Sequence, residues 1–226
     1  MVFKFGTKIL KFTSSPTEQT TATTDLLLSI VAAGAICYLQ WIKSPEAWKA
    51  NTWSLAFGLI ALSGVLGAIA HGLEMSETRH QRIWNLLNLS LGLAVSVFVI
   101  GVAYDLWGLA IARILLPWMV VLAVGFYLVT CLFDGIFIIF VIYEAVALLF
   151  ALVAYIWLTL TAQLNGALLM SLGVLASIIA AGIQATLKTS VKLIFEFDHN
   201  GIFHIVQIAG IILLAAGLSM ALLSPN

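Results

Sequence analysis

Long apolar segments alternate with short polar stretches along most of the chain. A helix that spans the hydrocarbon core of a bilayer needs about 20 predominantly apolar residues. The pattern predicts membrane-spanning helices at residues 26–42, 53–73, 83–104, 107–131, 135–158, 165–187 and 202–223. A β-barrel would show short segments of alternating polarity instead. The predicted fold class is therefore all-α, a polytopic membrane bundle of seven transmembrane helices.

The start of the chain differs from the rest, because it is rich in Ser, Thr and Lys and has no long apolar run. A secretory signal peptide would place a short apolar core close to the first residue, and this pattern is absent. We therefore predict a polar N-terminal tail at residues 1–25 and a single seven-helix transmembrane domain at residues 26–226.

Composition supports a membrane location. Hydrophobic residues make up 62% of the 226-residue chain and charged residues only 9%, whereas soluble proteins carry about 25% charged residues. The formal net charge is zero and no basic run occurs, so we expect no nucleic-acid partner. The expected partners are membrane lipids, among which a substrate or ligand would be found.

The basic residues predict the orientation of the chain, since Lys and Arg are enriched in cytoplasmic loops. On the side of the N-terminus the predicted loops carry Lys4, Lys8, Lys11, Arg79, Arg82, Lys188 and Lys192. The opposite side carries only Lys43, Lys49 and Arg113. We therefore expect a cytoplasmic N-terminus, and by default the plasma (inner) membrane of a prokaryote.

Polar residues within the apolar segments gather toward this predicted cytoplasmic side. They are His71, Asn85, Asn88, Gln184, Asn200, His204 and Gln207. Polar side chains at membrane depth usually face the interior of a bundle, so four helices would bring them to one level and form a site. Two alternatives stay open, namely contact of Gln184 with lipid headgroups and hydrogen bonds of Asn85 and Asn88 to neighbouring helices.

Glu144 is the acidic residue within the fifth predicted helix, beside Tyr143. A carboxyl group at this depth needs a proton or a hydrogen-bond partner. Its expected role is either a structural hydrogen bond, to Tyr143 or to another helix, or proton relay and substrate gating.

The segment Asp198-His199-Asn200-Gly201-Ile202-Phe203-His204 resembles the seventh-helix motif of the CREST superfamily, which includes alkaline ceramidases, adiponectin/progestin-type receptors and hemolysin III proteins. The resemblance extends to the seven-helix layout and to a histidine at the end of the second helix. It implies a zinc site with His71 and His204 as ligands. Asn200 stands where the family has another histidine, so His199 is the expected third ligand, and Asn85 or Asn88 would orient water or substrate.

This resemblance implies a zinc-dependent hydrolase that acts on lipid amide or ester bonds. A zinc ion held by three side chains lowers the pKa of a bound water toward about 7 and so produces a nucleophile. Two alternatives stay open. One is a non-catalytic receptor or sensor of the same fold, and the other is a small proton-coupled transporter that uses Glu144.

Overall fold

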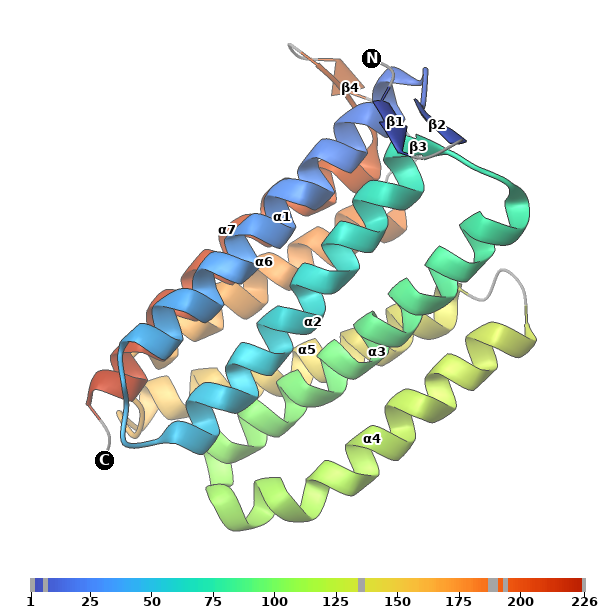
Figure 1. Ribbon diagram of the computed structural model, residues 1–226. Helices are drawn as coiled ribbons and strands as arrows, with labels where there is room; N and C mark the ends of the chain where they lie inside the picture. The colour runs from blue at the N-terminus through green and yellow to red at the C-terminus, as the bar shows by residue number, and fades with distance from the viewer. Residues whose placement is uncertain (1–2, 6–7, 134–136, 187–190, 193–194, 225–226) are drawn as a thin grey trace.

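The computed structural model describes residues 3–5, 8–133, 137–186, 191–192 and 195–224, and the side chains of residues 11–133, 139–186 and 195–224. Seven helices in this part of the chain are long and apolar enough to cross a membrane, which confirms the predicted fold class (Figure 1). They are α1 (Pro16–Trp41), α2 (Ala47–Gly72), α3 (Glu77–Trp107), α4 (Leu109–Leu132), α5 (Phe137–Leu160), α6 (Ala167–Thr186) and α7 (His199–Leu223).

Six of the helices form a closed ring. Going round it, α1 packs on α2, α2 on α3, α3 on α5, α5 on α6, α6 on α7, and α7 returns to α1. The remaining helix, α4, packs on α3 outside the ring (Figure 1). Only Ala112, Ala123 and Phe126 of α4 are buried. The ring thus closes where the first helix meets the last.

The bundle has two ends that differ in what they contain. We call the end where α1, α3, α5 and α7 begin the N-terminal end, and the end where these four helices finish the C-terminal end. Short strands lie at the N-terminal end (Figure 1). There β2 (Lys8–Phe12) pairs antiparallel with β1 (Phe3–Phe5) and with β3 (Leu73–Glu74), and β4 (Val191–Lys192) pairs with β5 (Glu196–Phe197).

The first helix begins at Pro16, rather than near residue 26 as the hydropathy pattern predicts, so residues 16–25 are helical. The side chain of Ser15 accepts a hydrogen bond from Glu18 N at 3.5 Å, and Pro16 occupies the first helical turn, where its missing N–H costs nothing. Thr20 and Thr23 donate their hydroxyl protons to carbonyls four residues earlier. These bonds allow a Thr-rich segment to remain helical.

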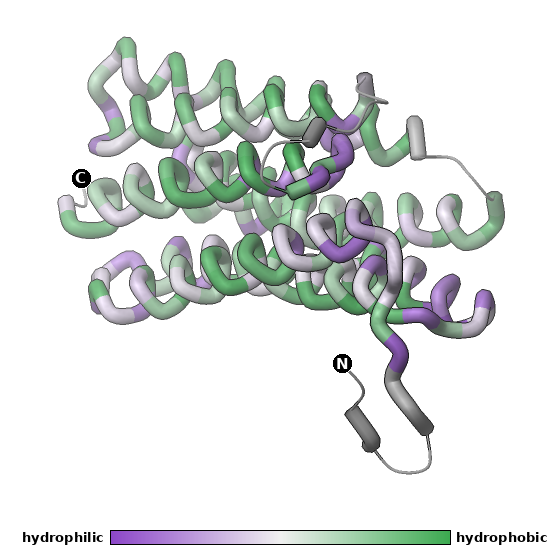
Figure 2. Tube along the Cα trace, turned by 90° about the horizontal axis from the view of Figure 1, so that it is seen from above, coloured by the Kyte–Doolittle hydropathy of each residue, from purple (hydrophilic) through white to green (hydrophobic). Residues whose placement is uncertain are grey.

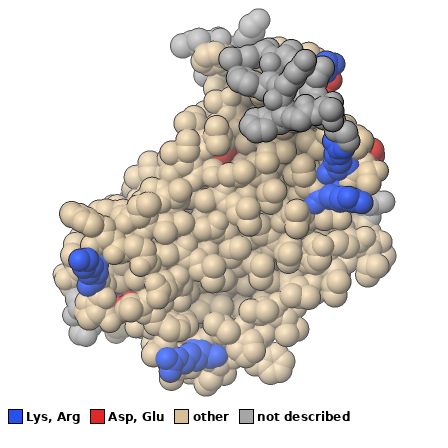
Figure 3. Space-filling view, viewed as in Figure 1, with Lys and Arg blue, Asp and Glu red and all other residues tan. Residues whose placement is uncertain are grey.

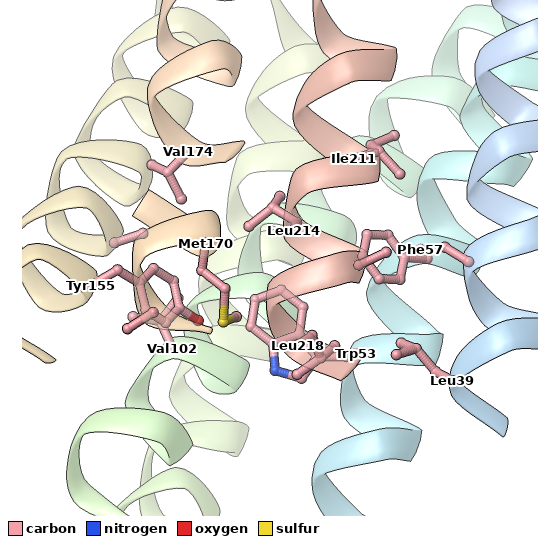
Figure 4. Close-up of a cluster of buried hydrophobic side chains, with 14 of the residues drawn as sticks. Leu39, Trp53, Phe57, Val102, Tyr155, Met170, Val174, Ile211, Leu214 and Leu218 are labelled. Atoms are coloured by element: carbon pink, nitrogen blue, oxygen red, sulfur yellow. The ribbon is translucent and has the colours of Figure 1, made fainter. Parts of the chain in front are cut away.

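The hydrophobic core fills the C-terminal half of the ring. Its largest fully buried side chains include Trp53, Phe57, Tyr155, Met170 and Leu218, which come from α2, α5, α6 and α7 and point toward one another (Figure 4). Aromatic and aliphatic side chains of this size leave little free volume when they interdigitate. The free space of the bundle therefore lies in its other half.

The outside of the bundle is largely apolar. Hydrophobic residues predominate along the helices, and most hydrophilic residues lie toward the helix ends (Figure 2). On the face shown in Figure 3, Lys and Arg side chains lie near the two ends with almost no charge between them. Such a surface fits a protein that is surrounded by lipid. Lys188, one of the basic residues used to predict the orientation, lies outside the described residues.

Candidate functional site

A cavity of about 660 Å³ lies toward the N-terminal end of the bundle, and the six helices of the ring line it together with Phe126 and Thr130 of α4. Its polar lining residues include Asp25, His71, Asn88, Glu144, Gln184, Asn200, His204 and Gln207. Its apolar lining residues include Phe98, Phe126, Phe140, Leu148 and Leu214. The structure thus brings most of the predicted polar residues to one place, and adds Asp25 to them.

Asp25 and His204 form a buried pair at the centre of the polar group. His204 Nε2 lies 3.1 Å from Asp25 Oδ1, and His204 Nδ1 lies 3.0 Å from the hydroxyl of Thr24. Only 5% of Asp25 and 7% of His204 are exposed. Both nitrogens of the imidazole are therefore engaged, which fixes the orientation of the ring between α1 and α7.

Asp25 lies directly against Gly67 of α2. A Cβ atom on residue 67 would come within 2.6 Å of Asp25 Oδ1, so a glycine is needed at this position to make room for the carboxylate. The second oxygen, Asp25 Oδ2, is buried and has no hydrogen-bond partner among the described residues. A buried polar atom without a partner is costly, and at a cavity it indicates a place where a bound molecule or water would donate.

Asp198 ties the start of α7 to α1. Its Oδ1 accepts hydrogen bonds from Gly201 N at 2.8 Å and from the Thr21 hydroxyl at 2.7 Å. Burial acts to raise the pKa of Asp198, but the hydrogen bonds from Gly201 and Thr21, the charge of His199 and a weaker bond from Asn200 outweigh it and lower the pKa below its usual value. Asp198 is thus a helix cap held in its ionised form.

His71 and His199 occupy different surroundings. His71, in the last turn of α2, lines the cavity; its Nδ1 lies 2.7 Å from Glu18 Oε2, and its ring meets the edge of Trp84. His199 does not line the cavity in the described structure. Because α7 already begins at His199, His204 lies five positions further along the same helix, and the two side chains diverge by about 140°.

The resemblance implies a zinc site formed by His71, His199 and His204. No three His, Cys, Asp or Glu side chains among the described residues are arranged to hold a metal ion. Two of the three expected ligands, His71 and His204, share the cavity, and the third does not.

The amide side chains also divide into two groups. Asn88, Gln184, Asn200 and Gln207 line the cavity, and Gln184 Nε2 donates to Asn200 Oδ1 at 3.3 Å. Gln207 Oε1 is buried and, among the described residues, has no partner. Asn85 instead accepts a hydrogen bond from Gln81 at 3.1 Å and is not among the lining residues. Of the two residues expected to orient water or substrate, only Asn88 is therefore in place.

Glu144 reaches the cavity from α5, about 10 Å from the start of that helix at 1.5 Å per residue. The expected hydrogen bond to Tyr143 is not formed, because the Tyr143 hydroxyl bonds to Ser96 at 2.6 Å and to the Gly92 carbonyl at 3.1 Å. Neither a hydrogen bond nor an ion pair joins Glu144 to any other described residue. Its carboxyl group is therefore free to meet a molecule in the cavity.

Asp25 and its neighbours Thr21 and Thr24 are the site residues that the hydropathy pattern missed, since they fall in the segment expected to be a tail. A signal was present in the sequence. Thr21, Thr24, Asp25 and Leu28 follow the i, i+3, i+4, i+7 spacing of one helix face, and all four are buried.

The comparisons with known proteins give a family and no function. A family model described as a family of unknown function (DUF6962) matches residues 20–222. No curated protein and no solved structure matches the chain. The matched range covers nearly the whole bundle and includes Asp25, His71, Glu144 and His204. The chain therefore belongs to the DUF6962 family.

Proposed function

We propose that this chain is a CREST-like membrane protein that binds an amphipathic, lipid-like molecule inside its helix bundle. The observation that carries the proposal is the cavity, which combines a buried polar group around Asp25 and His204 with an apolar wall of Phe98, Phe126 and Leu148. Ligand pockets typically measure about 300–1,000 Å³ and combine apolar walls with a few placed polar groups. At about 660 Å³ this cavity falls within that range.

The position of the cavity in one half of the bundle supports ligand binding rather than transport across the membrane. The N-terminal half holds the cavity, whereas the C-terminal half is filled by large side chains such as Trp53, Tyr155 and Met170. A transporter needs access from both sides of the membrane, so the packed half favours a binding site over a proton-coupled carrier. With the predicted orientation, the polar group lies in the cytoplasmic leaflet of the plasma membrane.

Zinc-dependent hydrolysis of a lipid amide or ester is the second candidate. The observation that favours it is that His71 and His204 line the same cavity, at the positions where the CREST resemblance expects two ligands. His204, held between Thr24 and Asp25, is placed to accept or donate a proton at the cavity. The described side chains do not complete a metal site, and for this reason binding stands first.

The test is native mass spectrometry of the purified protein, with identification of any lipid that stays bound. Ala147 lines the cavity and is 5% exposed, whereas its neighbour Val146 is 65% exposed on the outside of α5. We expect a bound lipid in the wild type, its loss in Ala147→Phe and its retention in Val146→Phe. Thermal unfolding would show that both variants are folded. Equal lipid content in the wild type and Ala147→Phe would contradict an internal site.

Metal analysis of the same samples separates the two candidates. Zinc bound at one ion per chain, and lost in His204→Ala, would establish the hydrolase and justify assays with lipid amides. Protein that stays free of metal after zinc is supplied would exclude the hydrolase and leave the binding function in place.

A further inference from the structure

We propose that the cavity selects a cationic head group, so that its ligand is an alkyl-chain amine with a primary ammonium. This inference rests on the proposed binding of a lipid-like molecule and adds the chemistry of its head group.

The cavity leaves hydrogen-bond acceptors unused. Among the described residues, Asp25 Oδ2 and Gln207 Oε1 are buried without a partner, and both residues line the cavity. Carboxylate and amide carbonyl oxygens accept hydrogen bonds. Buried polar atoms are almost always paired in folded proteins, so the missing partner has to bring N–H or O–H groups.

The charged side chains that line the cavity include two carboxyl groups, those of Asp25 and Glu144, and none of the described lining residues is Lys or Arg. His204 lies 3.1 Å from Asp25 but compensates its charge only when the imidazole is protonated, and Glu144 has no cationic partner among the described residues. A buried carboxylate is expensive unless a cation compensates it. An ammonium group would meet this need, whereas a phosphate or carboxylate head group would meet acceptors of its own sign.

The lining of the cavity is also aromatic. Trp84, Phe126, Phe140 and Phe203 contribute to it, and Phe126 is stacked on Tyr143 with ring centroids 5.3 Å apart. Aromatic faces attract ammonium ions within about 6 Å, and the rings also provide an apolar surface for an alkyl chain. A neutral alcohol would use the acceptors but would gain nothing from the acidic charge.

The experiment compares three probes with the same alkyl chain, decylammonium, decanol and decyl sulfate. Each is titrated calorimetrically into the full chain in lipid nanodiscs, below its solubility limit or micelle concentration, and the heat with empty nanodiscs is subtracted to remove partitioning into lipid. Opposite charges that are close and buried couple strongly. We therefore expect the ammonium probe to bind at least about tenfold more tightly than decanol, and decyl sulfate to bind more weakly still.

Substitutions of cavity residues test whether the preference for the ammonium probe arises in the cavity. Glu144→Gln keeps the shape of the side chain and removes its charge, so it should lower affinity for the ammonium probe about tenfold or more and leave decanol binding unchanged. Asp25→Asn should act in the same direction. The matched control is Glu74→Gln, because Glu74 lies at the same end of the bundle in an ion pair with Lys11 and outside the cavity.

The outcomes distinguish this inference from the function on which it rests. Equal binding of the ammonium probe and decanol to the wild type would overturn the charge selection and leave lipid binding intact. An ammonium preference that survives both Glu144→Gln and Asp25→Asn would also overturn it. Absence of binding by all three probes, together with no lipid retained on purification, would instead remove the proposed function itself.

Discussion

An aspartate is buried at each end of the bundle, and the two aspartates have different partners. At the C-terminal end, Asp105 Oδ1 lies 2.7 Å from the ammonium of Lys49, and Asp105 Oδ2 accepts a hydrogen bond from the Tyr155 hydroxyl at 2.9 Å. At the N-terminal end, Asp25 Oδ1 lies 3.1 Å from His204 Nε2. Asp25 Oδ2 accepts no hydrogen bond from a described residue. Both aspartates are almost fully buried.

The difference separates a structural charge from a functional one. Lys49, Asp105 and Tyr155 join α2, α3 and α5 in a network surrounded by packed side chains, with Trp48 stacked on Tyr104 beside it. The Lys49 ammonium compensates the charge of Asp105, although Asp105 Oδ1, like Asp25 Oδ2, accepts no hydrogen bond of standard geometry from a described residue. A buried charge without a cation beside it is costly. No Lys or Arg pairs with Asp25 among the described residues, and we therefore expect its counterpart in the cavity.

The largest loss of stability is expected when the ion pair between Lys49 and Asp105 is broken. Lys49→Met would leave Asp105 buried without its cation and lower the free energy of unfolding by about 3–5 kcal/mol. Unfolding in detergent micelles, followed by circular dichroism, would measure the loss. Lys43→Met is the control, because Lys43 is exposed at the same end. A loss no larger than that of the control would show that the pair does not hold this end together.

The next largest loss of stability is expected at Gly67, whose missing side chain makes room for Asp25. In Gly67→Ala the added Cβ would press on Asp25 Oδ1, and overpacking of a buried site costs about 1–3 kcal/mol. We expect lower stability in thermal unfolding and loss of the ammonium preference. Gly34→Ala on α1 is the matched control, since nothing lies within 4 Å of its added Cβ. Equal behaviour of the two variants would mean that Asp25 does not depend on this glycine.

A smaller effect is expected at the cap of α7. Removal of an N-cap carboxylate costs about 0.5–2 kcal/mol, so Asp198→Ala should unfold more easily than the wild type at neutral pH. The pKa of Asp198 is lowered in the folded state, so its contribution is complete above the unfolded value of about 4 and is lost as the pH falls through the lower folded pKa.

Unfolding of the wild type and Asp198→Ala at several pH values checks this pH dependence of the stabilisation by Asp198. The difference between them should stay constant from pH 7 to pH 5 and shrink below about pH 4. A difference that grows on acidification would contradict an ionised cap.

The smallest change in stability is expected at Asp25 itself. Asp25→Asn keeps an oxygen for His204, and the other oxygen has no described partner to lose, so the free energy of unfolding should change by less than about 1 kcal/mol. Asp105→Asn, which weakens the pair with Lys49, should cost clearly more. The same unfolding assay measures both. Equal losses would remove the contrast between a structural and a functional aspartate.

Much of the fold could be predicted from hydropathy, because a membrane-spanning helix requires a long apolar run and satisfies its own backbone hydrogen bonds. The prediction failed where a helix carried polar residues. Residues 16–25 were assigned to a tail because Thr is abundant there, and Lys49 was counted as a loop charge although only 3% of its side chain is exposed. Hydropathy averages over all faces of a helix and misses a polar residue whose partner lies on another helix.

The candidate site shows the same division. The structure brings His71, Asn88, Gln184, Asn200, His204 and Gln207 to one cavity, as expected for polar residues at one level of a bundle. Depth alone did not exclude His199 or Asn85, because the direction of a side chain depends on where its helix begins and which face it turns inward. The zinc site and the CREST resemblance stay predictions that metal analysis tests.

The sequence by itself determined the membrane location, the number of helices and the end of the bundle at which polar residues gather, because these follow from the length and polarity of local segments. Only the tertiary structure decided which polar groups meet. The pairing of Asp25 with His204 joins α1 to α7, and that of Lys49 with Asp105 joins α2 to α3. Such pairs depend on which helices become neighbours in the ring, which no local segment specifies.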